Sequence, residues 1–185
     1  MSIETSVAKI LRTSPIQRIN FKIEMVAVTP ALLANVAKAI DDGRIAVVEG
    51  GSGPSFSASY TQLRTSRAAS GNSGLIGRLT VGKQAPSTNL GKAAIVHESV
   101  HALVDLVPYK KLTMHKDEAI AYLADAIYMR ALQVKLTNTG KVKALYDAAY
   151  ALVDQKQLLT KPGTALKWDE CQSLLAAIKA IPAYR

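Results

Sequence analysis

The spacing of hydrophobic and polar positions predicts strands in the first half of the chain. Residues 20–28, NFKIEMVAV, alternate and predict one strand. Residues 29–43 predict a helix, because Thr29 can cap it, Pro30 suits its first position and Gly43 suits its end. A helix therefore follows directly on the first strand.

Two short apolar runs, residues 44–50 and 75–82, predict further strands. Residues 50–74, between these two runs, are rich in Gly, Ser, Thr and Ala and predict a loop or an irregular strand. Residues 83–91, KQAPSTNLG, predict a turn or the lead-in to a helix. The first half thus contains short strands joined by turn-forming segments.

Helical periodicity dominates the second half. A helix is predicted over 93–107, and Gly140 and the KPG at 161–163 separate the later elements. Further helices are predicted at about 116–136, 141–159 and 164–180. Strands followed by helices indicate an α+β fold class. A length of 185 residues suits one domain over 1–185.

Composition narrows the class of protein. The chain is 49% hydrophobic and 20% charged, and no apolar run reaches the roughly 18 residues that a membrane span needs. The first 20 residues lack a long apolar region, so a secretory signal peptide is not expected. We therefore expect a cytoplasmic protein without a membrane span, with export by a signal-free route left open.

The net charge of +9 raises the question of an acidic partner. The cations are scattered, and aromatic residues make up only 5% of the chain, which leaves few platforms for stacking bases. This pattern argues against a nucleic-acid partner. Cys171, the single cysteine, can form no internal disulfide and is expected to be a small buried residue.

The chemistry of the chain concentrates in an HExxH motif, His97-Glu98-Ser99-Val100-His101. A spacing of four places the two histidines on one face of a helix, where two neutral imidazoles can bind one Zn²⁺. Glu98 lies one residue further round, within reach of a water that the metal activates. This is the position that a general base needs.

VHESVHALVDL, residues 96–106, resembles the active-site helix of the zincin metallopeptidases. The Gly and His that metzincins have after the motif are missing, so the resemblance is to a minimal form of the gluzincin branch. It implies a zincin-like core, a small N-terminal sheet followed by a helical half. It also implies Glu118, on the next helix, as third ligand. Two antiparallel helices would then face each other.

Alternatives remain for the residues around the metal. Asp105, Asp117 and His115 could replace Glu118 as third ligand, although Asp117 should face about a hundred degrees away and cap its helix. Tyr122 stands where thermolysin-like members have the Asp that orients a histidine. Asp125 or Asp105 is therefore expected to orient a ligand.

An oxyanion stabiliser is also expected, and its candidates are Tyr122, Tyr109 and His115. The strand predicted at 75–82 is either the sheet edge that holds an extended peptide or an ordinary core strand. The sequence does not show whether residues 50–74 cover the site.

Two functions fit these features. The first is a zinc-dependent peptidase acting on a peptide or protein substrate, with His97, His101 and Glu118 as metal ligands. In it, Glu98, Tyr122 and His115 are the catalytic candidates. The second is a non-catalytic zinc-containing module whose basic surface binds an acidic partner or nucleic acid. The sequence fixes neither the cleavage specificity nor the oligomeric state.

Overall fold

The computed structural model describes residues 2–50, 57–63, 74–107, 112–134 and 140–184. It confirms a mixed α+β architecture. The helices are α1 (Ile3–Ile10), α2 (Pro30–Asp41), α3 (Asn89–Leu106), α4 (Met114–Ala131), α5 (Gly140–Gln155) and α6 (Gln172–Lys179). The strands are β1 (Phe21–Ile23), β2 (Val26–Val28), β3 (Ile45–Glu49), β4 (Ala58–Gln62), β5 (Gly77–Val81) and β6 (Thr164–Leu166). Short 3₁₀ turns are η1 (Ser14–Arg18), η2 (Ala85–Ser87), η3 (Trp168–Cys171) and η4 (Pro182–Tyr184).

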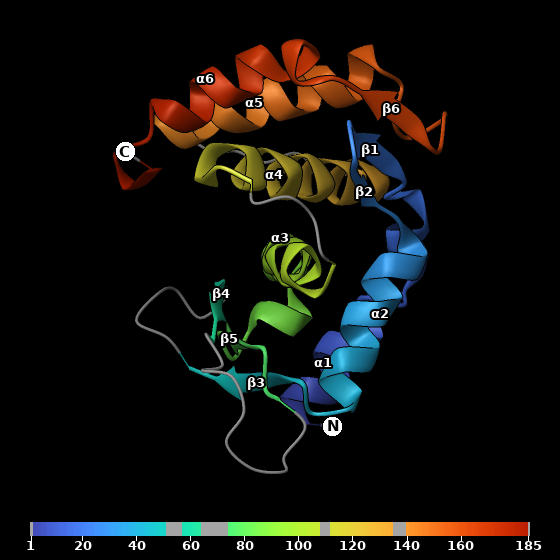
Figure 1. The fold of residues 1–185 in the computed structure, drawn as a ribbon, viewed down its shortest axis with the longest axis vertical. Coiled ribbons are helices and arrows are strands. Elements are labelled where there is room, and N and C mark those ends of the chain that lie inside the picture. Colours follow the sequence, from blue (N-terminus) through green and yellow to red (C-terminus); the bar gives the residue numbers. More distant parts are fainter. Residues whose placement is uncertain (1, 51–56, 64–73, 108–111, 135–139, 185) are drawn as a thin grey trace.

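The helix α3, which carries the motif, lies at the centre of the molecule (Figure 1). In this view it is seen nearly end-on, with α4 lying across one side of it and the sheet of β3, β4 and β5 on the other. Beyond α4 lie α5 and α6, while α1 and α2 flank the stack. α4 therefore crosses α3, and the antiparallel arrangement expected from the sequence is wrong.

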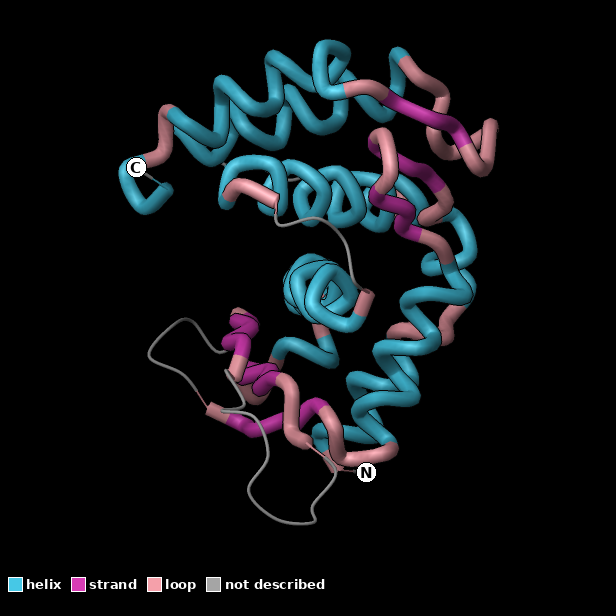
Figure 2. Tube along the Cα trace, viewed as in Figure 1, coloured by secondary structure: helices cyan, strands magenta, loops and turns pink. Residues whose placement is uncertain are grey.

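The strands form two small sheets, coloured magenta in Figure 2. One has the order β3-β5-β4, with β3 parallel and β4 antiparallel to β5. The other has the order β2-β1-β6, with β6 parallel to β1. The expectation of one N-terminal sheet is therefore wrong, because β6 comes from the C-terminal part of the chain.

The segment 20–28 folds as a hairpin, not as one strand. Glu24 has φ 51 and Met25 is 80% exposed, so these residues form the turn. The alternation changes phase there: Phe21 and Ile23 are buried before the turn, and Val26 is buried after it. A phase change of this kind is the sequence signal of a turn between two strands.

The single helix expected over 164–180 is also wrong. Thr164–Leu166 pairs with β1, η3 follows, and α6 begins only at Gln172. β2 occupies one edge of β1, and β6 pairs with the other edge. The pairing of β6 completes the sheet, in which Leu166 is buried. Tertiary pairing of this kind overrides local helix propensity.

The other predicted elements are confirmed with shifted ends. Thr29 caps α2 by accepting from the N–H of Leu32, and Gly43, at φ +71, follows its end. β3 and β5 occupy the two apolar runs. α1, which the sequence pattern did not predict, buries Val7 and Ala8.

Among the residues that the structure describes, no helix is both long enough and apolar enough to cross a membrane. The buried apolar residues form one cluster to which all six of these helices contribute. Cys171 is buried in that cluster, as expected.

Candidate metal centre and cleft

The helix α3 presents the motif on a rigid element. Thr88 caps its start by accepting from the N–H of Gly91, and the helix runs on to Leu106. Val96, Val100 and Leu103 are fully buried or nearly so, which fixes the rotation of the helix. His97 and His101 then lie on the side that α4 crosses.

The two histidines converge with Glu118 of α4. The Nε2 atoms of His97 and His101 are 3.3 Å apart. Glu118 places Oε2 at 3.4 Å from His97 Nε2 and Oε1 at 3.7 Å from His101 Nε2. One ligand atom from each of the three residues lies within 4.8 Å of the others. The three side chains thus form one cluster across the helix crossing.

The cluster has the dimensions of a zinc site. Ligand atoms about 2.0–2.1 Å from a tetrahedral Zn²⁺ lie roughly 3.3–3.4 Å from one another, close to the first two separations. Glu118 Oε2 is buried and accepts no hydrogen bond of good geometry from the described residues. An unsatisfied buried carboxylate oxygen next to the Nε2 atom of His97 is costly unless a cation completes it. The donor set therefore fits Zn²⁺.

Asp117 orients His101. Its Oδ2 lies 2.9 Å from His101 Nδ1, on the side of the ring away from Nε2. Burial alone would lower the pKa of His101, but the hydrogen bond and charge of Asp117, with Glu98 and Glu118, raise it to about 9. This partner leaves Nε2 free for a metal, in the way that carboxylates hold metal-binding histidines.

Glu98 lies beside the cluster and is tied to the sheet. Its Oε2 accepts a hydrogen bond of 2.8 Å from the backbone N–H of Tyr60 in β4. Burial raises the pKa of Glu98, while the two nearby imidazoles and this N–H act in the opposite direction. The carboxylate is therefore close to the three candidate ligands without being one of them.

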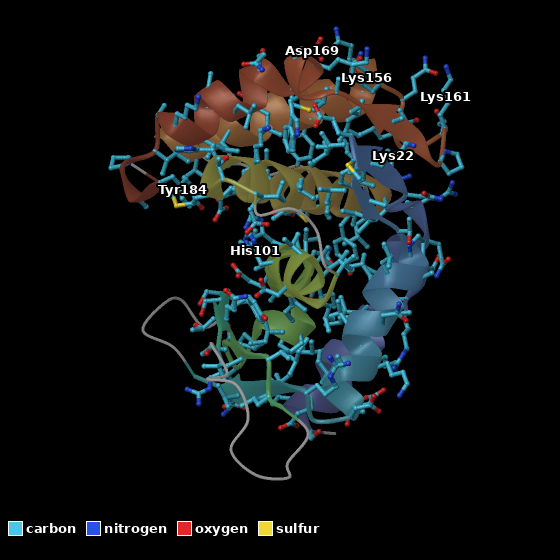
Figure 3. All side chains as sticks on the ribbon, viewed as in Figure 1. Lys22, His101, Lys156, Lys161, Asp169 and Tyr184 are labelled. Atoms are coloured by element: carbon cyan, nitrogen blue, oxygen red, sulfur yellow. The ribbon has the colours of Figure 1, made fainter. Side chains whose placement is uncertain are left out.

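These groups open into a cleft of about 320 Å³. Figure 3 shows His101 on the side of α3 that faces α4, with Tyr184 beyond it on the same flank of the molecule. No Lys or Arg occurs among the lining residues that the structure describes. The lining residues are Tyr60, Gln62, His97, Glu98, His101, Asp105, Asp117, Glu118 and Tyr184.

The two acids expected to orient a ligand have other partners. Asp105 accepts a 3.0 Å hydrogen bond from Gln62 Nε2, which ties α3 to β4. Asp125 is 1% exposed and accepts a hydrogen bond from the hydroxyl of Tyr146. Burial raises the pKa of Asp125 to about 6, although the nearby His97 acts to lower it. Neither acid belongs to the metal cluster.

Tyr122 and His115 lie behind the cleft lining. The ring of Tyr122 packs edge-on against His97, with centroids 4.4 Å apart, and its hydroxyl lies 2.9 Å from that of Tyr184. His115 Nε2 lies 2.8 Å from the backbone carbonyl of Tyr184. Both residues therefore contact Tyr184, which itself lines the cleft.

The remaining oxyanion candidate, Tyr109, lies outside the described residues, and so does most of 50–74. Part of that segment is described: it forms β4, which lies beside α3. β5 is paired on both sides, so the strand predicted at 75–82 is not the edge; β4 is.

Two site residues, Tyr184 and Tyr60, escaped the sequence reasoning, and a third, Asp117, was considered there only as an alternative ligand or a helix cap. Tyr184 is 62 residues from its partner Tyr122, and no local pattern marks it. Tyr60 contributes through its backbone, which any residue type would supply. Asp117 had a signal: an imidazole has a second nitrogen pointing away from the metal, so a residue a hundred degrees round the helix can reach it.

Comparisons of the chain with protein-family models, curated proteins and solved structures find no significant match. The case for a function therefore depends on the geometry of the cleft.

The pKa of His101 predicts how the metal-free protein responds to pH. A histidine whose folded pKa is raised from 6.5 to about 9 stabilises the fold fully below pH 6.5 and loses that contribution as the pH rises through about 9. We expect urea denaturation in the presence of a chelator to show stability falling over this interval. Asp117→Asn should flatten the fall, and the exposed Asp169→Asn should not. An equal loss of stability in the unchanged protein, Asp117→Asn and Asp169→Asn would contradict the assignment of the raised pKa to the His101–Asp117 pair.

The cluster also predicts a ranking of metal affinities. His97→Ala, His101→Ala and Glu118→Ala each remove one of the three candidate ligands and should abolish Zn²⁺ uptake at micromolar metal. Asp117→Asn should weaken Zn²⁺ binding about 10- to 100-fold, because it removes only the partner that orients His101.

The matched control is Asp105→Asn, which changes a carboxylate of the same cleft that bonds to no ligand. It should leave the affinity within a few-fold of the unchanged protein. Competition with a chromogenic chelator gives the ranking, and a larger effect at Asp105 than at Asp117 would refute it.

Proposed function

We propose that this chain is a zinc-dependent peptidase with a zincin-like core of the minimal gluzincin kind. The observation that supports it most is the convergence of the two imidazoles with Glu118 while Glu98 lines the same cleft. His97, His101 and Glu118 would hold the ion. Three protein ligands leave one position of a tetrahedral ion open, which is the property of catalytic zinc sites.

Zn²⁺ held there would supply Lewis-acid chemistry, lowering the pKa of a water and polarising the carbonyl of a peptide bond. The residues of the chain handle the proton. Glu98, which is not a ligand, accepts the proton of the attacking water and then delivers it to the leaving amine. Its hydrogen bond from Tyr60 keeps the carboxylate aimed along the cleft.

The edge strand β4 is suited to hold an extended peptide. Leu63 and Ser57 make their backbone hydrogen bonds on the inner side of the sheet, and Tyr60 turns its N–H outward to Glu98. Backbone groups alternate along an antiparallel strand, so residues 58, 60 and 62 face away from β5. A peptide adding to this edge would lie next to the general base.

Tyr184 is the residue best placed to stabilise the carbonyl oxygen. Its phenol lines the cleft with the metal ligands, whereas Tyr122 and His115 lie behind it. Burial raises the pKa of Tyr184 to about 12, so the phenol remains protonated at neutral pH and can donate. A hydroxyl aimed at a developing oxyanion favours the transition state over the substrate.

The alternative, a module with a structural zinc site, is less consistent with the cleft. A structural site closes with four protein ligands, and the cluster in the described residues has three. A buried Glu98 beside it costs desolvation without completing the coordination. That arrangement is explained by a base that must stay free.

The charge of the cleft indicates the substrate class. Glu98, Asp105, Asp117 and Glu118 line it, and no Lys or Arg occurs among the lining residues described. Glu118 is the proposed ligand and Glu98 the proposed base, so Asp105 and Asp117 remain as further negative charges in the cleft. A cleft of one sign concentrates oppositely charged substrates, so we propose peptides with a basic residue near the scissile bond.

Glu98→Gln separates catalysis from metal binding. The amide keeps the shape but cannot accept a proton, so peptide hydrolysis should fall at least 100- to 10,000-fold while Zn²⁺ content is unchanged. Casein or a peptide library serves as substrate, and Glu24→Gln, in the exposed turn between β1 and β2, is the control. Cleavage by Glu98→Gln at the rate of the unchanged protein would refute the peptidase proposal.

The proposed preference for basic peptides is tested with matched peptides that carry Lys, Gln or Glu beside the bond cleaved in the library. We expect kcat/KM to rank Lys above Gln above Glu, with the differences shrinking as salt is raised, because surface electrostatics are screened. Asp105→Asn should reduce the differences in kcat/KM between the three peptides. A preference for Glu would show that the charge of the cleft does not select the substrate.

A further inference from the structure

Tyr184 reaches the cleft from η4, and two residues of α4 hold it there. The backbone carbonyl of Tyr184 lies 2.8 Å from His115 Nε2, and its hydroxyl lies 2.9 Å from that of Tyr122. Each contact bridges more than 60 residues of sequence. The main chain and the side chain of Tyr184 are thus fixed separately, by two different anchors.

The anchors share a helix face with the third ligand. His115, Glu118 and Tyr122 are spaced i, i+3 and i+7 along α4, which places them on one side of that helix. One rigid element therefore carries a metal ligand and both contacts that place the phenol. A shift of α4 would move the ligand and the phenol together, which preserves the distance between them.

The environment of the two phenols decides which of them donates to the other. The half-buried ring of Tyr122 packs edge-on against the rings of His97 and Tyr146, and its hydroxyl makes a hydrogen bond with that of Tyr184. The hydroxyl of Tyr184 faces the cleft and feels the charges of Glu118 and Glu98. These charges favour the arrangement in which the proton of Tyr184 points toward the cleft and Tyr122 donates to its oxygen.

We propose that Tyr122 and His115 are positioning residues that act through Tyr184: Tyr122 donates to its hydroxyl and His115 to its carbonyl, so that the phenolic proton points into the cleft. This inference rests on the proposed function for the role of Tyr184, and it assigns new roles to two residues that the sequence marked as catalytic. Neither touches the substrate. Their effect on the reaction is the alignment of one donor.

The test is a double-mutant cycle read by binding as well as by catalysis. The probe is acetohydroxamate, a small metal-binding oxyanion, added to the Co²⁺-substituted protein and followed by visible absorption. Tyr184→Phe should weaken the probe about 10- to 100-fold, the effect of one hydrogen bond to a charged oxygen. Tyr122→Phe and His115→Leu should each weaken it about three- to tenfold.

The cycle distinguishes positioning from general stability. In a Tyr184→Phe background, Tyr122→Phe and His115→Leu should have no further effect, because the donor that they align is absent. His115→Gln, which retains an N–H donor, should recover most of the loss. With a peptide substrate, kcat should fall and KM should change little. Tyr150→Phe, in the same aromatic cluster without a contact to Tyr184, is the matched control.

Three outcomes decide between the proposals. If the cycle behaves as expected but no peptide is hydrolysed, the positioning inference stands and the peptidase proposal fails. If hydrolysis depends on Glu98 but the effects of Tyr122→Phe and Tyr184→Phe are additive, the inference fails and the peptidase proposal stands. A protein that takes up neither Zn²⁺ nor Co²⁺ overturns both.

Discussion

The site depends on the close crossing of α3 and α4. α4 is buried on opposite sides, with Ala119 and Ala126 on one side and Ala121 and Ala124 on the other, and such small side chains let neighbouring helices approach closely. The crossing brings His97 and His101 within 3.4–3.7 Å of Glu118 and leaves all three side chains at most 14% exposed. Polar groups so removed from water must compensate one another or bind a cation. The packing of apolar residues thus buries these polar side chains, and a bound metal ion would offset the cost of that burial.

The sheet contributes to the same centre through β4. The backbone N–H of Tyr60 holds Glu98, and Gln62 holds Asp105, so two hydrogen bonds fix the edge strand to α3. The N–H of Tyr60 is thereby occupied by Glu98, the proposed general base. A peptide pairing with this edge would have to use the carbonyl of Tyr60 and the N–H of Gln62 in its place. The register of a bound peptide and the aim of Glu98 are then set by one strand.

The sequence predicted the parts of this site that depend on short-range spacing. Helical geometry predicted the histidine pair with Glu98 beside it, and the resemblance to zincins implied Glu118 on the next helix. The structure brings the two histidines and Glu118 into one cluster, with Glu98 in the same cleft. The sequence could not predict contacts made by distant residues. Tyr184 meets Tyr122 across 62 residues, and β6 becomes a strand only because β1 has an open edge. The crossing of α3 and α4 could not be predicted for the same reason, since periodicity shows which face of a helix is buried but not the direction of the helix packed against it.

The distribution of charge reconciles a basic chain with an acidic cleft. The net charge is +9, yet the described residues that line the cleft include four carboxylates and no Lys or Arg. The labelled Lys22, Lys156 and Lys161 lie on the outer side of the molecule, far from His101 (Figure 3). A nucleic-acid backbone would be repelled from the cleft and could bind only at a distance from it. Under the proposed function, a cationic peptide would experience the opposite field: the basic outer surface would repel it, and the acidic cleft would attract it toward Glu98.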